Sequence, residues 1–420
     1  MEIISQHPVQ AHKKTLVLEN SNVEEQYIMP KEYVVGVDVG GQTSKIGIVD
    51  RRGNIVSQTV INSRYGADEA SVFIDSLCNA IKELTSKVGF DSIQGIGIGA
   101  PNGNYYQGTI EDAANLAWAK GKVIKIADEV SARLDNIPVR VTNDANAAAM
   151  GEMTYGVARG MKNFIMITLG TGVGSGIVIN GEVVYGNDGF AGELGHTRAV
   201  KHNGRLCGCG RTGCLEAYTS AIGVARTAQE WLEMSDEPSI LRNIAKITSK
   251  DVYEAAIKGD DLAKRVFIFT GHMLGESFAD FVAFSAPEAI VLFGGLARAG
   301  KLIMDPIVEA MEANLLSIWK GKVKVIFSAL KESDAAIFAP ALSVGNCYAI
   351  TKQPKARAER AKSVAKQLHQ AKTSEQRCRH TWRQRSRLVI LLKIILFYCL
   401  TFTTRQSHVL HVRCGCLAFS

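Results

Sequence analysis

Two segments of the chain share one pattern, in which an apolar strand runs into a glycine-rich turn and straight out into a second strand. The first is YVVGVDVGGQTSKIGIVD at residues 33–50, and the second is FIMITLGTGVGSGIVI at residues 164–179. They start about 130 residues apart in the sequence. A repeat at this spacing predicts an internal duplication, with two similar α/β lobes facing each other.

Composition narrows the class of protein further. The 420 residues are 46% hydrophobic with 39 Gly and 9 Pro, which excludes a wholly disordered, collagen-like or coiled-coil chain. Residues 351–420 carry 15 Lys and Arg against 2 Asp and Glu, so residues 1–350 have a net charge of −6. This acidic body lacks the basic surface of a nucleic-acid binder. Sparse cysteines and no signal-peptide pattern predict a cytoplasmic protein.

The periodicity of the hydrophobic residues divides the chain into four parts. We expect an N-terminal extension at 1–32, a small α/β lobe at 33–142, a large α/β lobe at 143–334, and a basic and apolar tail at 351–420. A helix near 335–350 would complete the small lobe. Further elements are predicted as helices at 70–88, 122–134 and 144–153, strands at 93–98, 138–142, 289–293 and 323–327, and a mostly helical stretch at 215–283.

The tail contains the apolar run LVILLKIILFYCL at 388–400. This run is shorter than the ~20 residues that a spanning helix needs, and Lys393 interrupts it. A membrane anchor is therefore disfavoured, and an interfacial basic helix or an aberrant end are the alternatives, of which we favour the last. The tail also holds four residues that can bind metal in principle, without a folded context to support it: His408, His411, Cys414 and Cys416.

The glycine-rich turns are candidates for binding phosphate. Glycines let backbone N–H groups approach a phosphate closely, and a carboxylate just before them, here Asp38, can hold Mg²⁺ through water. An ordinary β-hairpin with glycines at positive φ is the alternative for a single turn. Neither turn leads directly into a helix, so neither fits a dinucleotide fingerprint, and a nucleotide held between two hairpins fits better. Gly294 and Gly295 form a third glycine site, on the adenosine side.

Asn143 and Asp144 stand where a predicted strand gives way to a helix. Both residue types are favoured helix N-caps, which is the simplest interpretation. Phosphoryl transfer to an alcohol, however, needs one carboxylate at the attacking hydroxyl, and this acid lies between the two glycine turns in the sequence.

His196 and the segment CGCGRTGC at 207–214 form the strongest local signal. Three thiolates and one imidazole complete a tetrahedral Zn²⁺ shell, and four protein ligands make such a site structural. Three reduced cysteines without metal are the alternative. Two acids flank these ligands, Glu193 and Glu216, and they either bind sugar hydroxyls or are solvated surface acids.

Several motifs together resemble the ROK-family sugar kinases, a bacterial glucokinase type within the actin-like and hexokinase-like ATPase superfamily. The resemblance covers about residues 33–349, and the zinc signature with the GELGH segment is its most diagnostic part. The matching segments are VDVGGQTSKIGIVD (37–50), GIGIGAPNG (95–103), TNDANAAAMGE (142–152), TLGTGVGSGIVINGEVVYG (168–186), AGELGHT (191–197), CGCGRTGCLEAY (207–218) and IVLFGGL (290–296).

The resemblance implies a two-lobed, ribonuclease H-like fold, a structural zinc site in the larger lobe, and transfer of the ATP γ-phosphate to a hexose. Glucose is the favoured acceptor, and the family suggests a homo-oligomer, a dimer or a tetramer. Asp144 would be the catalytic base, and the expected sugar contacts are Asn115, Asn143, Asp144, Glu193, His196 and Glu216. The expected zinc ligands are His196, Cys207, Cys209 and Cys214. ATP and Mg²⁺ would contact Asp38, Gly40, Gly41, Gln42, Thr43, Lys45, Gly170, Thr171, Gly172, Gly174, Gly294 and Gly295.

The sequence departs from the family in three places. Gln42 stands where the first turn usually has Thr, the interval between His196 and Cys207 is one residue longer, and the tail has no counterpart.

Other functions stay open as alternatives. A kinase for N-acetylmannosamine, N-acetylglucosamine, allose or fructose shares these motifs. A sugar-responsive repressor of the family is expected to carry a DNA-binding domain before the first turn, for which 32 residues are too few. A sugar-binding pseudoenzyme is the third alternative.

Overall fold

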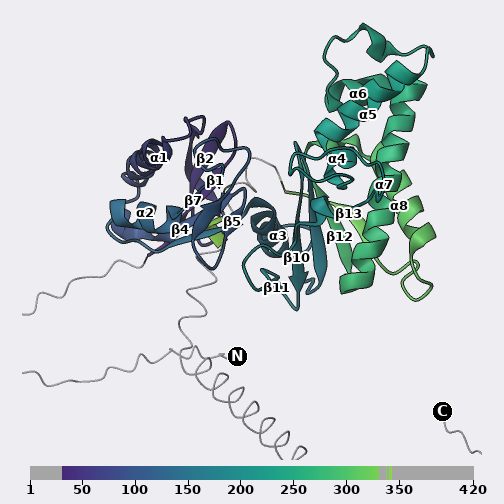
Figure 1. The fold of residues 1–420 in the computed structure, drawn as a ribbon. Coiled ribbons are helices and arrows are strands. Elements are labelled where there is room, and N and C mark those ends of the chain that lie inside the picture. The colour runs from purple at the N-terminus through teal and green to yellow at the C-terminus, as the bar shows by residue number, and fades with distance from the viewer. Residues whose placement is uncertain (1–30, 331–336, 338–339, 343–420) are drawn as a thin grey trace, which may run out of the picture. The chain divides into compact units, whose positions relative to one another are not determined.

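The computed structural model describes residues 31–330, 337 and 340–342, and Figure 1 shows their fold. The first sheet has the strand order β3-β2-β1-β4-β8. Strands β1, β2 and β3 are antiparallel neighbours, whereas β4 and β8 run parallel to β1. The bounds are β1 Tyr33–Val39, β2 Thr43–Val49, β3 Ile55–Asn62, β4 Ile93–Ala100 and β8 Val139–Asn143.

The second sheet repeats this topology, with the order β11-β10-β9-β12-β13. Strands β9, β10 and β11 are antiparallel neighbours, and β12 and β13 run parallel to β9. The bounds are β9 Phe164–Leu169, β10 Val173–Ile179, β11 Glu182–Val183, β12 Ala289–Phe293 and β13 Lys324–Phe327. The duplication and the α/β class predicted from the two glycine-rich repeats are therefore confirmed.

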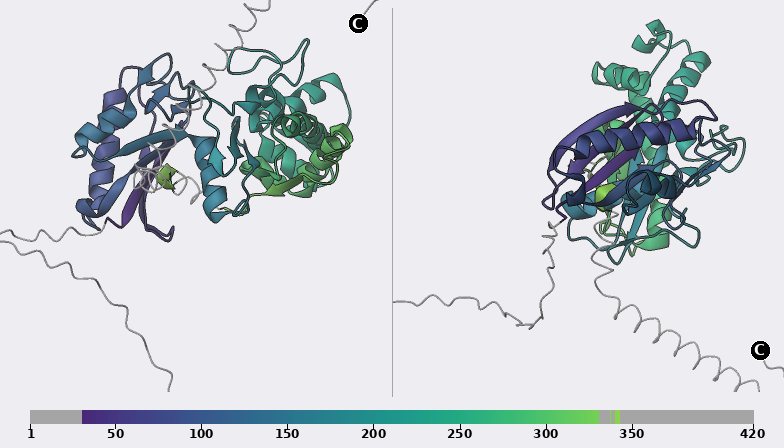
Figure 2. Two further views of the ribbon diagram at one scale, coloured as in Figure 1. Left: turned by 90° about the horizontal axis from the view of Figure 1, so that it is seen from below. Right: turned by 90° about the vertical axis from the view of Figure 1, so that its left-hand side faces the viewer.

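Helices cover the first sheet where the sequence has a helical period. In α1, Ala70–Thr85, the residues Phe73, Leu77 and Ile81 recur every four positions and are fully buried. The helix packs on β2 and β3 (Figure 2). Helix α2, Ile126–Arg133, packs on β8, and α3, Asp144–Tyr155, packs on β9 and β10 of the second sheet.

The second sheet has a larger set of helices, and α7 and α8 lie side by side (Figure 1). Two glycines of α7 allow this close packing, because a methyl group at Gly275 would lie 2.4 Å from the backbone oxygen of Ile307 and one at Gly271 would meet the ring of Pro306. The bounds are α4 Glu216–Thr219, α5 Ala221–Met234, α6 Ser249–Ile257, α7 Asp261–Ser285 and α8 Lys301–Asn314. Four 3₁₀ turns complete the described elements: η1 Phe90–Ser92, η2 Leu194–His196, η3 Ile240–Asn243 and η4 Gly295–Ala299.

A small third sheet differs from the sequence prediction. It has the order β5-β6-β7, with β5 at Gly103–Asn104, β6 at Thr109–Glu111 and β7 at Val123–Ile124. The helix expected from residue 122 therefore begins later, at Ile126, and the helix expected to reach residue 88 ends at Thr85. The strands of this sheet are two or three residues long, which leaves no alternating pattern to recognise.

Residues near 340 pack against the first sheet. A methyl group at Gly36 would lie 1.9 Å from the backbone oxygen of Ile337, and one at Gly99 would lie 3.0 Å from the ring of Pro340. Ile337 and Ala341 form a small core cluster with Val49. The remainder of the helix expected at 335–350 and the whole tail lie outside the described residues. Among the helices that the structure describes, none has the length and apolar character to cross a bilayer.

Candidate active site and metal centre

The two glycine turns occupy equivalent places, one between β1 and β2 and the other between β9 and β10. Their glycines are not in the left-handed region, so the positive φ expected for a simple hairpin is not what selects them. Close approach explains part of the choice: a methyl group at Gly41 would lie 3.0 Å from the backbone oxygen of Asn115, and one at Gly174 would meet Ala145 and Thr168. The first turn thus abuts Asn115, an expected sugar contact.

Asp38 lies on β1 directly before the first turn and is paired in register with Lys45 on β2. Burial, and after it the charge of Asp144, raise the pKa of this carboxyl to about 7, although the charge of Lys45 opposes both effects. A carboxylate held in this way is poorly solvated and gains most from a bound cation. Gln42 and Thr43, the other expected contacts in this turn, are exposed.

Asn143 and Asp144 end β8 and begin α3. The Asn143 side chain accepts a hydrogen bond from the Ala145 N–H at 2.8 Å, as a helix N-cap does, and Asp144 Oδ1 accepts from the same N–H at 2.8 Å. Asn143 therefore caps the helix, while the Asp144 side chain contacts solvent. Desolvation by the surrounding protein raises the pKa of Asp144.

Glu193 belongs to the same electrostatic group. Desolvation is the main cause that raises its pKa, His196 opposes this effect, and the charges of Asp144 and Glu216 add to it. The structure thus brings three acids from distant parts of the sequence within mutual influence beside one histidine. Acids gathered in this way, with the pKa values of Asp144 and Glu193 raised, are typical of functional sites.

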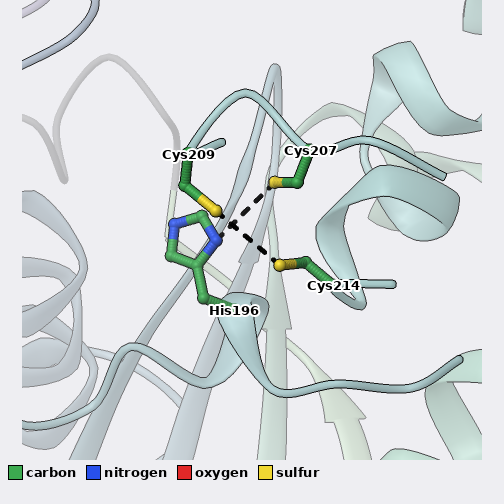
Figure 3. A group of neighbouring side chains, drawn as sticks. All are labelled: His196, Cys207, Cys209 and Cys214. Atoms are coloured by element: carbon green, nitrogen blue, oxygen red, sulfur yellow. Dashed lines mark hydrogen bonds between the residues drawn. The ribbon is translucent and has the colours of Figure 1, made fainter. Parts of the chain in front are cut away.

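The side chains of His196, Cys207, Cys209 and Cys214 point toward one another (Figure 3). One ligand atom from each lies within 4.8 Å of the others. The Cys209 and Cys214 Sγ atoms are 3.7 Å apart, and Cys207 Sγ is 3.8 Å from His196 Nδ1. Zn–S bonds of about 2.3 Å give tetrahedral edges of about 3.8 Å, so the four residues fit a zinc ion.

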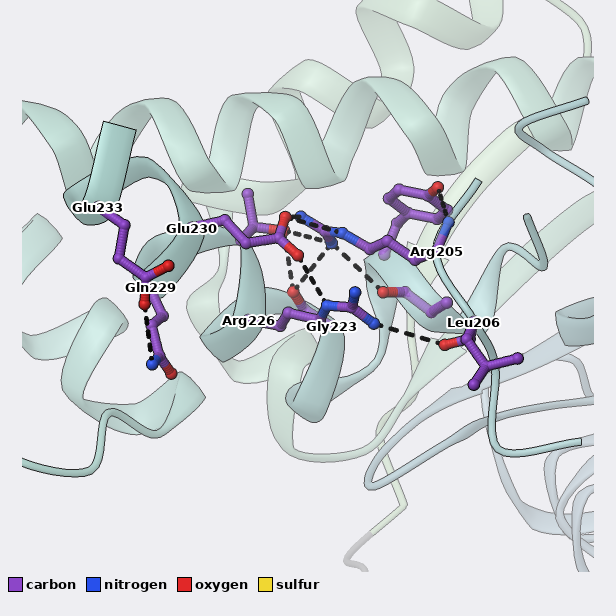
Figure 4. A network of polar contacts seen from close by, with 10 residues as sticks. Arg205, Leu206, Gly223, Arg226, Gln229, Glu230 and Glu233 are labelled. Atoms are coloured by element: carbon purple, nitrogen blue, oxygen red, sulfur yellow. Dashed lines mark hydrogen bonds and ion pairs between the residues drawn. The ribbon is translucent and has the colours of Figure 1, made fainter. Parts of the chain in front are cut away.

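Arg205 fastens this cysteine loop, residues 200–214, to helix α5 (Figure 4). Its guanidinium donates to Glu230 Oε2 at 2.5 Å and to Thr227 Oγ1 at 2.8 Å, and it lies 4.6 Å from the ring centroid of Tyr218. Arg226 completes the network by donating to Glu230 Oε1 at 2.7 Å. The loop is therefore tied to the lobe by contacts that need no metal.

A cavity of about 730 Å³ lies next to the first sheet's Lys45. Gly294, with φ of +102°, lines it from the end of β12, where a methyl group would meet the backbone oxygen of Leu169 at 2.6 Å. Gly295 begins η4 immediately beyond. The cavity also includes Arg298 and Ser328, which sequence reasoning missed. Ser328 directly follows β13, and the rule that ligands bind at the carboxyl ends of parallel strands would have indicated it.

Ser328 also forms a hydrogen bond with a buried acid, Glu152, that the sequence did not indicate. Glu152, near the end of α3, is completely buried, and its carboxylate accepts hydrogen bonds from the Ser328 hydroxyl and the Val157 N–H. Burial raises the pKa of Glu152. The acid thereby connects α3 to the segment that follows β13.

The comparisons with known proteins agree with this geometry. The model of the ROK family matches residues 34–344. The chain belongs to the ROK family. A glucokinase from Halalkalibacterium halodurans is 38% identical over 295 residues, which are 69% of this chain and 88% of that protein.

Two further relatives show the range of this ROK protein's family. The crystal structure of a ROK family glucokinase from Streptomyces griseus, in complex with glucose and AMPPNP, is 32% identical with a TM-score of 0.62 and covers 74% of this chain and 98% of that chain. A xylose repressor from Caldicellulosiruptor bescii is 26% identical over 71% of this chain and 75% of the repressor. This chain is therefore similar both to a kinase and to a regulator.

Proposed function

We propose that this ROK protein transfers the γ-phosphoryl group of ATP to the 6-hydroxyl of glucose. The observation that carries the proposal is the position of Asp144, at the start of α3, where its charge acts on both Asp38 beside the first glycine turn and Glu193 beside the histidine. A sugar hydroxyl next to Asp144 and a triphosphate on the turns would then be reaction partners.

Asp144 is the proposed catalytic base. It would accept the proton of the sugar hydroxyl, and a base of ordinary strength suffices because the transition state of phosphoryl transfer is loose. Desolvation raises the pKa of Asp144, which makes its carboxylate a better proton acceptor. The sugar would be held by carboxylates, amides and one imidazole that pair with its hydroxyl groups, namely those of Asn115, Asn143, Glu193, Glu216 and His196.

The two turns are the proposed phosphate sites. Backbone N–H groups of the two turns, such as those of Gly41, Gln42, Thr171 and Gly172, would hold the triphosphate, and Thr171 is exposed and available for it. Asp38 and Lys45 would stand at the phosphates, where Asp38 can hold Mg²⁺ and the ion would neutralise phosphate charge. Adenosine would lie in the cavity lined by Gly294.

The zinc ligands would be His196 and the three cysteines of the cysteine loop. A closed shell of four protein ligands leaves no position for water, so zinc would stabilise the loop and take no part in the reaction. Without an ion, burial raises the pKa of Cys207 to about 12, and a bound cation would hold the thiolate.

A coupled ADP-release assay with a panel of hexoses tests the proposal. We expect turnover with glucose above that with N-acetylmannosamine, N-acetylglucosamine, allose or fructose, and about one zinc per chain in the same preparation. The Asp144→Asn variant is the matched control for background ATP hydrolysis. No ADP release with any hexose, although sugar binds, would instead indicate a sugar-binding regulator or pseudoenzyme.

Three other expectations stay predictions. They are the division into lobes at 33–142 and 143–334, the homo-oligomer, and the cytoplasmic location. Light scattering of the purified protein measures the oligomeric state directly.

A further inference from the structure

The second glycine turn is attached at two points to the segment that follows the last cysteine ligand. The Ala221 N–H, at the start of α5, donates to the Gly170 oxygen at 2.9 Å. The Val173 N–H donates to Glu216 Oε2 at 2.9 Å, and Glu216 stands two residues after Cys214. Both ends of the turn are therefore fixed by the same short stretch of chain.

The turn and the Glu216 carboxylate also fit each other sterically. A methyl group at Gly172 would lie 2.5 Å from Glu216 Oε2, so only glycine leaves room for the carboxylate at this point. The other oxygen, Oε1, lies 3.4 Å from Cys207 Sγ. One side chain thus contacts the second turn on one side and a zinc ligand on the other.

We infer that Glu216 is a positioning residue for the nucleotide, because its carboxylate fixes the turn that receives the ATP phosphates. This inference rests on the proposed function and adds to the sugar contact expected of the same residue. A hydrogen bond from a backbone N–H to a carboxylate is charge-assisted and holds the turn before ATP arrives. Loss of the bond would leave the turn free to adopt conformations that do not bind phosphate.

The test measures binding of ATP with Mg²⁺ by calorimetry in the absence of any hexose, where a sugar contact has no influence. We expect Glu216→Ala to raise the Kd for ATP about five- to tenfold, which is the loss of about one hydrogen bond. Glu216→Gln should stay within about twofold, since its amide oxygen can still accept from the Val173 N–H. Glu233→Ala is the matched control, an exposed acid on α5 that lies outside the proposed binding sites and whose removal should leave the Kd unchanged.

A second pair of variants keeps the test decisive if Glu216→Ala loses zinc, which metal analysis would report. Gly172→Ala should weaken ATP binding by a similar factor, because its methyl group displaces the carboxylate. The same substitution in the Glu216→Ala background should have almost no further effect, since the clash is gone. Additive losses in the double variant would overturn the inference.

The remaining outcomes separate this inference from the proposed function. Wild-type protein that does not bind ATP contradicts the proposed function itself. Wild-type protein that binds ATP with the same Kd as Glu216→Ala contradicts only the positioning role. Tighter binding by both Glu216→Ala and Glu216→Gln would show that the negative charge repels the phosphates, and it would also overturn the inference.

Discussion

Replacing Asp38 by asparagine should make the protein more stable at alkaline pH. The pKa of this carboxyl rises from 3.8 to about 7 on folding, chiefly through burial. A group whose pKa is raised by folding contributes its full stability below the unfolded value and loses it as the pH rises through the folded value. The wild-type protein therefore loses stability between about pH 4 and pH 7, and Asp38→Asn, which cannot ionise, does not.

The size of the effect follows from the shift. Each pKa unit corresponds to about 1.4 kcal/mol, which gives an upper bound of about 4 kcal/mol above pH 7. Asp38 keeps some contact with solvent, and screening reduces the gain to about 2 kcal/mol. Such a gain raises Tm by about 4 to 8 °C in a unit of about 150–250 residues, and by less in the larger unit that contains Asp38.

Thermal melting of the wild type and Asp38→Asn at pH 5 and pH 8, without nucleotide or Mg²⁺, measures this difference. The gain in Tm should be larger at pH 8. Asp50→Asn on the same hairpin is the matched control of opposite sign, since hydrogen bonds from Asn54 lower the pKa of Asp50 and its replacement should reduce Tm at pH 8. An equal gain at both pH values, or a lower Tm of Asp38→Asn at pH 8, would refute the reasoning.

Three further predictions concern other parts of the molecule. Asp144→Asn should keep sugar binding while kcat for ADP release falls by several powers of ten, and unchanged turnover would remove Asp144 from the mechanism. Cys209→Ser should release zinc, measured by metal analysis, and weaken hexose binding; full affinity for hexose would disprove the structural role of the metal. Burial raises the pKa of Glu152, so the stability of the folded protein falls as the pH rises through this raised pKa. Glu152→Gln cannot ionise and should make the fall in Tm with pH smaller in a series of melting curves.

The sequence predicted the parts of the fold that have local signals. Both glycine turns, the strands around them and the strand at 289–293 follow from apolar runs that end at glycine, and the α3 boundary follows from Asn143 and Asp144. The four metal ligands were predictable because their residue types allow few other roles. Their approach to within 4.8 Å of one another is consistent with that choice.

Other features depend on contacts between distant segments and have no local signal. The hydrogen bond from the Val173 N–H to Glu216 joins residues that are 43 positions apart in the sequence. The hydrogen bond from Ser328 to Glu152 joins residues that are 176 positions apart. The short strands β5 and β7 form because each finds a partner in β6, not because of their own composition. The positive φ that was the alternative explanation for a glycine turn is not observed, and crowding accounts for glycine at Gly41 and Gly172.

The backbone contact between Gly36 and Ile337 has a consequence for synthesis on the ribosome. This face of the first sheet is closed by residues that emerge about 300 positions later in the chain. At translation rates of about 5–20 residues per second, the residues that cover the strand containing Gly36 are synthesised about 15 to 60 s after that strand. The nascent protein therefore exposes an apolar surface for that interval, and a chaperone that recognises such surfaces would find it before the enzyme is complete.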